Sequence, residues 1–247
     1  MDSTLQRQVK VIFFDAVGTL IETRERVGEI YGRVAHEFGF EAEPQILQQN
    51  FAHSFRRQPP LTFPAGTPAA ILVELEKGWW RNLVEDVFDG LGPFPRFEEF
   101  FGEIFERFRG HEFWSVYADA EPALEDLKHH GLKLGVISNF DSRLYDVLGA
   151  CNLDRFFDSI HFSTRAGSAK PDPAIFQAAL SYHAVEARRA MHVGDSLRED
   201  FEGATAAGIN AVLLDRDNGI AESAPAPNRI TTLEQIGDLL ESFTKNS

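Results

Sequence analysis

Five short runs of β-branched and aliphatic residues are spaced along the chain, and each is followed by polar or turn residues. They cover residues 9–15, 132–138, 157–163, 190–195 and 211–215. The last four alternate with helical patterns, and near-continuous apolar runs between helices are typical of parallel strands buried on both faces. The pattern therefore predicts an α/β fold in which helices cover both faces of a parallel sheet.

Residues 24 to about 110 show a different pattern, in which apolar side chains recur at helical spacing and no strand is expected. The stripes are Val27, Ile30, Tyr31, Val34 and Phe38, then Leu72, Leu75, Trp79, Leu83 and Val87, then Phe97, Phe100, Phe101, Ile104, Phe105 and Phe108. Prolines in the loop at residues 57–68 would interrupt a helix and divide the segment. We expect an all-helical domain at residues 23–110, inserted into a core domain of residues 1–22 and 111–247, with the aromatic stripes serving packing.

The C-terminal part begins with a loop at residues 217–229. A last amphipathic helix is expected after it, with apolar positions Leu233, Ile236, Leu239, Leu240 and Phe243.

The formal charge of -14 over 247 residues changes the picture of possible partners. It argues against a nucleic-acid backbone or an anionic membrane surface as the main partner. The single cysteine, Cys151, excludes an internal disulfide and fits a reducing compartment. No signal peptide or membrane span is expected, because no apolar run is long enough. These features predict a cytoplasmic protein that binds an anion only at a local positive site.

Charged residues follow several of the predicted strands. Asp15 and Asp195 end two of them, Asp200 follows five residues later at the start of a helix, and Lys170 precedes the helix that begins in KPDPAIF. Ligands of such sheets bind beyond the carboxyl ends of the strands. Carboxylates gathered there would repel one another unless something neutralised them, and a hard divalent cation with oxygen ligands does so.

The stretches DAVGTL, VISNFD, SAKPDPAIF and VGDSLREDFEGATAAG, in this order and on these strands, resemble the haloacid dehalogenase-like (HAD) hydrolase superfamily. The resemblance spans residues 9 to about 214, and the helical insert lies where the family's helical cap lies. It implies a Rossmann-like, doubly wound core, a mobile cap, Mg²⁺ and a covalent aspartyl intermediate. The implied substrate is a small phosphorylated metabolite.

Site residues are carried over by position in these motifs. Asp15 is similar to the family's nucleophile, and Lys170 to the cation that steadies the nucleophile and the phosphoryl group. Thr19 and Ser138 match the groups that hydrogen-bond the phosphate, with Asn139 close by. The resemblance also implies a metal site, whose members are Asp15, the backbone carbonyl of Val17, Asp195 and Asp200.

Val17 departs from the pattern of the family's phosphatases, in which a second aspartate protonates the leaving group and then activates water. Valine can do neither, although its backbone carbonyl is unaffected. A group of this kind contributes roughly 10² to 10⁴ in rate. We therefore expect poor hydrolysis of alkyl phosphates unless another group substitutes, and Asp141 and Glu22 are the candidates by proximity in sequence.

Several functions are compatible with Val17. The first is a specialised or weakened Mg²⁺-dependent phosphohydrolase, and the second is a catalytically inactive binding protein. A 2-haloacid dehalogenase is a third, although such enzymes have a tyrosine at this position and a less acidic last motif. A phosphonate-cleaving enzyme is a fourth, and it would need Lys77, the lysine of the cap, as its Schiff-base residue.

Substrate identity depends on the cap. His53, Arg56, Arg57 and Arg81 could reach a substrate or lie on the surface. The aromatic cap residues could serve internal packing or a dimer contact, so both a monomer and a homodimer fit the sequence.

Overall fold

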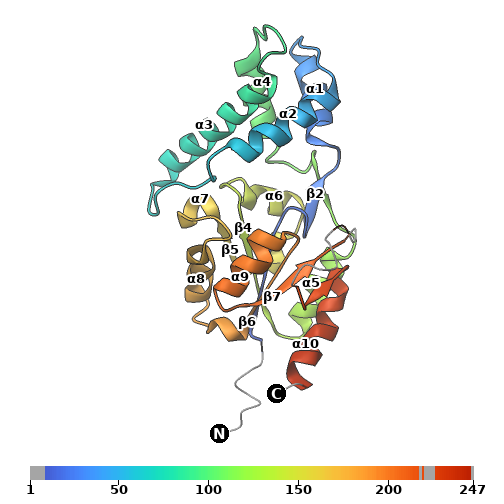
Figure 1. Ribbon diagram of the computed structural model, residues 1–247, viewed down its shortest axis with the longest axis vertical. Helices are drawn as coiled ribbons and strands as arrows, with labels where there is room; N and C mark the ends of the chain where they lie inside the picture. The colour runs from blue at the N-terminus through green and yellow to red at the C-terminus, as the bar shows by residue number, and fades with distance from the viewer. Residues whose placement is uncertain (1–8, 217–218, 220–225, 246–247) are drawn as a thin grey trace.

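The computed structural model describes residues 9–216, 219 and 226–245, and within them six parallel strands form one sheet in the order β5-β4-β1-β6-β7-β8 (Figure 1). The strands of this sheet are β1 (Val11–Phe14), β4 (Lys133–Ser138), β5 (Ser159–Phe162), β6 (Ala190–Gly194), β7 (Asn210–Leu214) and β8 (Arg229–Ile230). The chain starts in the middle, extends to one side through β4 and β5, and returns to the other side through β6. The strand order therefore reverses beside β1, and a crevice at its carboxyl end is the expected ligand site.

All of the predicted sheet strands are confirmed, and so is the α/β class with a Rossmann-like core. Strand β8 was not predicted, because two residues are too short to show a pattern. The same holds for β2 (Ile21–Thr23) and β3 (Trp114–Val116), which pair antiparallel.

Both faces of the sheet are buried, because alternate side chains of each strand enter different clusters. Along β1, Ile12 and Phe14 join one cluster, whereas Val11 and Phe13 join the other. The helices that contribute to the first are α5 (Ala120–His129), α6 (Leu144–Ala150) and α10 (Ile236–Lys245). Those of the second are α8 (Pro173–Tyr182) and α9 (Gly203–Ala206). Burial on both sides explains the continuous apolar runs in the sequence.

The segment between β2 and β3 is helical, as predicted, and Figure 1 shows its helices grouped at one end of the molecule. They are α1 (Val27–Glu37), α2 (Pro44–Arg57), α3 (Ala69–Phe88) and α4 (Phe97–Arg107). They enclose their own cluster, in which the fully buried Phe100 contacts the rings of Tyr31, Phe88 and Phe94. The aromatic stripes therefore pack against one another. The division at residues 23 and 110 stays a prediction, and β2 and β3 pair close to both points.

Buried hydrogen bonds join α3 to the core. Glu76 is 1% exposed and accepts from the backbone N–H and the hydroxyl of Ser142, at 3.0 and 2.5 Å. It also accepts from the hydroxyl of Thr164 in α7 (Ser163–Ala166), at 2.5 Å. Burial raises the pKa of Glu76, against the lowering effect of these hydrogen bonds. The cap helix is thus tied to the loop that follows β4.

An ion pair in that loop continues the contact. Arg143 donates from Nε and Nη2 to Asp141, at 2.9 and 2.6 Å, and both side chains are buried. Trp80 of α3 donates from its indole N–H to the same carboxylate, at 2.5 Å. The guanidinium lies 4.0 Å from the ring centre of Phe105 in α4. The Asp141–Arg143 ion pair of the core loop is therefore covered by the aromatic side chains of Trp80 and Phe105 from the cap.

The remaining elements are short, and they complete the chain to α10. They are the 3₁₀ turns Asp154–Phe156, Ala187–Arg189 and Leu233–Gln235 and the π-helical turn η4 (Leu197–Glu202). The predicted last helix is confirmed as α10. Residues 217–218 and 220–225 of the predicted loop, and the side chain of Phe243, lie outside the described residues. In the part of the chain that the structure describes, every helix is too short or too polar to cross a membrane.

Asp141→Ala is expected to lower the free energy of unfolding by about 3 to 5 kcal/mol, because it leaves the Arg143 guanidinium buried without its carboxylate. Urea unfolding followed by circular dichroism measures the loss. The matched control is Glu99→Ala, which removes the exposed partner of Arg96 and should change stability little. Equal losses in the two variants would mean that the buried pair does not stabilise the cap contact.

Candidate active site and metal centre

Lys170 lies between two carboxylates at the carboxyl edge of the sheet. Its Nζ donates to Oδ1 of Asp15 at 2.5 Å and to Oδ1 of Asp200 at 2.6 Å. The lysine is 4% exposed, Asp15 7% and Asp200 1%, so all of these charges are nearly shielded from water. Asp15 follows β1, Lys170 lies just before α8, and Asp200 belongs to η4. The predicted convergence of these residues is therefore present in the structure.

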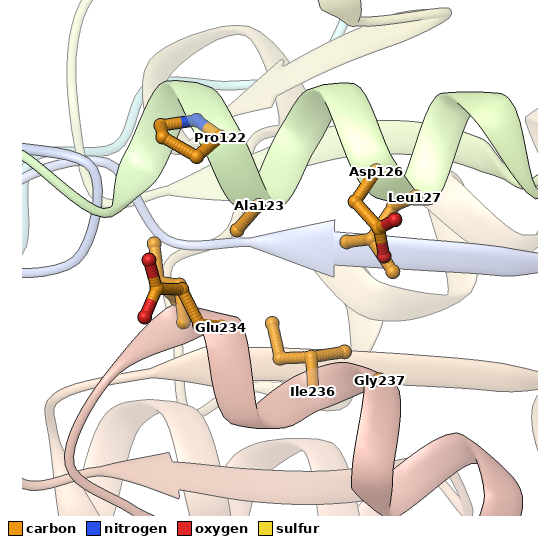
Figure 2. Close-up of a pocket in the computed structure, with 8 residues that line it drawn as sticks. Pro122, Ala123, Asp126, Leu127, Glu234, Ile236 and Gly237 are labelled. Carbon is orange, nitrogen blue, oxygen red and sulfur yellow. The ribbon is translucent and has the colours of Figure 1, made fainter.

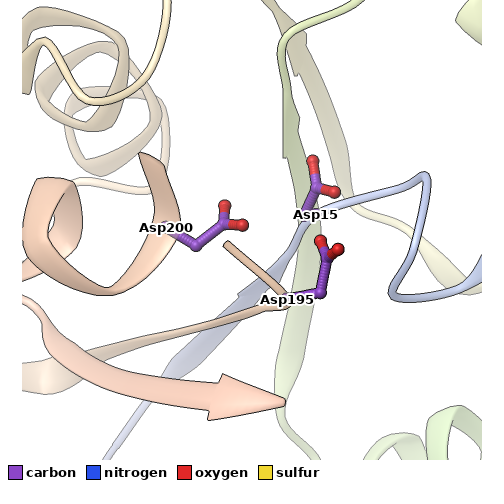
Figure 3. Close-up of side chains that lie close together, drawn as sticks. All are labelled: Asp15, Asp195 and Asp200. Carbon is purple, nitrogen blue, oxygen red and sulfur yellow. The ribbon is translucent and has the colours of Figure 1, made fainter. Parts of the chain in front are cut away.

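Asp195 follows β6 and completes the acidic group, and Figure 3 shows the carboxylates of Asp15, Asp195 and Asp200 turned toward one another. One oxygen from each lies within 4.8 Å of the others. Asp195 is exposed, whereas the other two are buried. Asp195 is therefore the member of the acidic group that solvent can reach most easily.

Glycines make room for these side chains. A Cβ on Gly194 would lie 2.1 Å from Cγ of Asp200, and one on Gly18 would lie 2.4 Å from Oδ2 of Asp195. Gly18 also has a φ of +89°, which other residues rarely adopt. Both positions thus require glycine, because the carboxylates of Asp195 and Asp200 lie where a Cβ atom would be.

The pKa values reflect burial and crowding. Burial raises the pKa of Asp15, although the neighbouring Lys170 opposes the rise. Burial likewise acts to raise the pKa of Asp200, but Lys170 and His192 hold it below its usual range. For Lys170, burial is outweighed by Asp15 and Asp200, which raise its pKa. Although Asp195 is exposed as a residue, the protein around its carboxyl group removes part of its hydration, and this loss together with the charges of Asp15 and Asp200 raises its pKa to about 7. The single positive charge of Lys170 therefore does not fully offset the carboxylates of Asp15, Asp195 and Asp200 at this edge of the sheet.

The turn after β1 presents backbone and hydroxyl groups beside Asp15. The carbonyl of Ala16 accepts from the N–H groups of Leu20 and Ile21, at 2.8 and 3.0 Å, which closes the turn. Val17 is 38% exposed, so its side chain is not part of the core. The hydroxyl of Thr19 is buried and has no hydrogen-bond partner among the described residues. Such a group is expected to meet a water molecule, an ion or a ligand.

The end of β4 supplies the remaining predicted residues. Phe14 pairs with Val136, so Ser138 lies two positions further along, at the same edge as Asp15, and it is buried. The side chain of Asn139 is already engaged in hydrogen bonds with the backbone of Lys170. Its Oδ1 accepts from the N–H of Lys170 at 2.7 Å, and its Nδ2 donates to the carbonyl of Lys170 at 3.0 Å. Asn139 therefore fixes the lysine backbone, and substrate contact by this residue stays a prediction.

The proposed replacements for the missing acid fare differently. Asp141 is fully buried and already accepts from Trp80 and Arg143, so it is a poor proton donor. Glu22 is exposed on β2 and hydrogen-bonds Tyr117. Tyr117 has a pKa raised to about 12 by burial and by Glu22, so it too is a weak acid. Of the two candidates, Glu22 is therefore the one that remains as a replacement for the missing general acid.

The candidate cap residues make surface contacts. Arg81 donates to Glu98 and Glu85, and Arg57 approaches His53 at 3.2 Å. Lys77 lies 6.0 Å from the ring centre of Phe105. Arg56 is exposed. The contacts of Arg81 and Lys77 are thus within the cap itself.

Sequence reasoning missed His192 and Glu199. His192 contacts Asp200, and Glu199 accepts from Nδ2 of Asn139 at 3.1 Å. The signal for His192 was a polar residue in the buried run AMHVGD. For Glu199 the sequence holds no signal other than its position next to Asp200.

A cavity of about 140 Å³ lies elsewhere, between α5 and the α10 end of the chain (Figure 2). Asp126 and Glu234 are among its lining residues, together with apolar groups such as Ile236. The acidic side chains make it a poor place for an anionic substrate, and none of its lining residues belongs to the predicted site.

The donor set fits a hard divalent cation. Carboxylate oxygens are the ligands that Mg²⁺ prefers, and the surplus negative charge at this edge favours it. The unpartnered hydroxyl of Thr19 and the cation Lys170 fit an anionic group next to the metal. The residues present are therefore compatible with a metal and an anion together.

This sheet, its switch point and the charged edge define an α/β protein with an inserted helical cap, and the ligand of such a fold is expected beyond the strand ends. The model of the haloacid dehalogenase-like hydrolase family matches residues 9–208. The chain belongs to this family.

Individual relatives agree with this membership. Haloacid dehalogenase-like hydrolase domain-containing protein 3 of Mus musculus is 32% identical over 249 residues, covering 97% of this chain and 98% of the relative. The Homo sapiens protein of the same name is 34% identical over 209 residues, covering 84% and 82%.

Solved structures share the fold. A HAD phosphatase from Thermococcus onnurineus aligns with a TM-score of 0.68 at 23% identity, covering 94% of this chain and 98% of that one. A 2-haloacid dehalogenase from Pseudomonas syringae aligns with a TM-score of 0.67 at 25% identity, covering 96% and 100%. The fold is therefore shared by proteins described as catalysing different reactions.

The raised pKa of Asp195 predicts a pH effect on the metal-free protein. Between about pH 4 and about pH 7 the Asp195 carboxyl binds more protons in the folded state than in the unfolded state, so the contribution of this group to stability falls as the pH rises through this window. The substitution Asp195→Asn should therefore remove this loss of unfolding free energy at the higher pH. Because the carboxyl contacts water, the expected gain is about 1 to 2 kcal/mol at about pH 8.

Urea unfolding with a chelator, at about pH 5 and about pH 8, tests this prediction. Glu125→Gln, at an exposed position, is the control and should leave the pH dependence unchanged. Because buried histidines such as His161 have lowered pKa values and act in the opposite direction, the test is the difference between wild type and Asp195→Asn. An Asp195→Asn variant with the same pH dependence as wild type would contradict the raised pKa of Asp195.

Proposed function

We propose that this protein is a Mg²⁺-dependent phosphohydrolase that acts on a small phosphorylated metabolite through an aspartyl-phosphate on Asp15. The observation that carries the proposal is the buried Asp15–Lys170 pair, at 2.5 Å, beside the acidic residues Asp195 and Asp200. A phosphoryl group in transfer needs compensation for its negative charge, and catalysis consists mainly of positioning and such compensation.

The chain's own residues have separate tasks in this reaction. One carboxylate oxygen of Asp15 attacks phosphorus, the bond to the leaving oxygen breaks, and water then cleaves the acyl phosphate to release phosphate and free Asp15. Lys170 orients Asp15 and offsets the charge of the phosphoryl oxygens. The hydroxyls of Thr19 and Ser138 hydrogen-bond those oxygens.

The metal would be held by Asp15, the carbonyl of Val17, Asp195 and Asp200. It supplies positive charge that lets an anion approach the acidic edge. This assignment is supported by the clustering of the carboxylate oxygens.

Val17 decides the range of substrates. A valine transfers no proton, so an alkoxide leaving group would depart without assistance, at a cost of roughly 10² to 10⁴ in rate. Acyl and aryl phosphates have leaving groups that need no such help. We therefore propose activity on good leaving groups, or assistance from a group outside the first motif such as Glu22.

Asp15→Asn should lower phosphate release from acetyl phosphate or p-nitrophenyl phosphate with Mg²⁺ by roughly 10⁴-fold, because the amide cannot act as the nucleophile. Phosphate release at saturating substrate gives the comparison. Retention of wild-type turnover in this variant would exclude the aspartyl-phosphate route.

Val17→Asp should raise hydrolysis of alkyl phosphates by roughly 10² to 10⁴, because it restores a proton donor beside the leaving group. Acetyl phosphate should respond far less. Val17→Asn, of similar size and unable to transfer the proton, is the matched control. An equal gain from both variants would show that polarity, and not proton transfer, limits the wild type.

Val17 also favours a second candidate, a catalytically inactive binding protein that keeps phosphate and Mg²⁺ affinity. Wild-type protein that is silent on every phosphate ester, with turnover appearing in Val17→Asp, would favour this candidate. A dehalogenase is less well supported, since the acidic residues Asp195 and Asp200 suit a cation. Halide release from 2-chloropropionate without metal would revive it.

A further inference from the structure

His192 lies in the centre of the sheet, where an apolar residue would be ordinary. It belongs to β6 and pairs with Phe13 of β1 and Ala211 of β7. Its side chain is 0% exposed, and its ring meets the edge of Phe176 with centroids 5.2 Å apart. Burying a polar ring without hydrogen bonds costs stability. Its presence in this strand therefore calls for a specific partner.

That partner is Asp200. Nε2 of His192 lies 2.8 Å from Oδ1 of Asp200, the oxygen that also accepts from Lys170 at 2.6 Å. The other oxygen accepts from the backbone N–H of Ser196 at 3.0 Å. The absence of a side chain on Gly194 leaves the space that this carboxylate occupies. Asp200 is thus held by hydrogen bonds to His192, Lys170 and Ser196.

The second ring nitrogen identifies the tautomer. Nδ1 of His192 is buried and without a hydrogen-bond partner in the described part of the chain. A proton on Nδ1 would be left unpaired, and the lone pair of Nε2 would face a carboxylate oxygen 2.8 Å away. A proton on Nε2 avoids both costs. The neutral Nε2–H form therefore donates to Asp200.

We propose that His192 is a positioning residue of the metal site, which fixes the Asp200 carboxylate so that its one remaining lone pair, on Oδ2, can serve a metal held together with Asp15 and Asp195. The proposal rests on the metal site of the proposed function. Partners that orient a ligand typically change metal affinity by about 10- to 100-fold when they are removed. His192 itself contacts neither metal nor substrate.

A purely structural role predicts a different outcome. If His192 only filled space, an apolar residue of similar size would serve as well, because Asp200 would keep its bonds to Lys170 and Ser196. His192→Leu tests this by removing the donor. His192→Gln keeps an N–H donor at a similar reach. Met191→Leu, a substitution at the neighbouring strand position that enters the other cluster, is the matched control.

The experiment measures Mn²⁺ binding to the full chain by electron paramagnetic resonance, without substrate, with Mn²⁺ as a stand-in for Mg²⁺. His192→Leu should weaken binding by about 10- to 100-fold, whereas His192→Gln and Met191→Leu should stay within about threefold of wild type. Thermal unfolding of each metal-free variant establishes that it is folded. Nitrogen-15 spectra of the histidines should show the Nε2–H tautomer for the wild-type residue that disappears in the variants.

Several results would overturn the proposal. They are wild-type affinity in a folded His192→Leu, an equal loss in His192→Gln, a proton on Nδ1, and a wild type that binds no Mn²⁺. None of these readouts depends on turnover. The expected order of affinities in a protein that releases no phosphate would support the role of His192 and count against the proposed activity alone.

Discussion

The position of Lys170 between Asp15 and Asp200 is the constraint around which this edge of the molecule is organised. Carboxylates brought together in low dielectric repel one another, and a buried ammonium at hydrogen-bond distance offsets much of that repulsion. The lysine must therefore be held in place. Asn139 does so by bonding both the N–H and the carbonyl of the Lys170 backbone. The acidic site depends on this arrangement across segments thirty or more residues apart in the sequence.

Much of this fold and part of the site followed from the sequence, for a definable reason. Strands buried on both faces give continuous apolar runs, and the carboxyl ends of parallel strands meet at one edge, so Asp15 and Asp195 could be placed together before any coordinates. Strand β8 and the β2–β3 pair were missed because they have two or three residues each. The role of Asn139 was missed because its partner, 31 residues away, is a backbone group without sequence signature.

The loop after β4 links two parts of the molecule that the sequence pattern treats separately. Ser138 and Asn139 belong to the active edge, whereas Asp141 to Arg143 form the buried contact with α3 and α4. Only a few residues separate the two groups. Glu76 and Trp80 of the cap therefore hydrogen-bond to a segment that is continuous with the candidate site, so the position of the cap is coupled through this loop to the residues proposed to contact the substrate.

The same charges also bear on what Val17 means. A valine at this position removes the proton transfers to the leaving group and from water, but it leaves the buried lysine, its carboxylates and the unpartnered Thr19 hydroxyl in place. Such groups contribute little to folding, because apolar residues of the same volume commonly stabilise a core as well or better. An edge that collects surplus carboxylates around one lysine is thus poorly explained by stability. It fits the proposed pair of ligands, a cation that supplies the missing positive charge and an anionic group that accepts the hydroxyl's hydrogen bond, whatever the rate at which the anion is turned over.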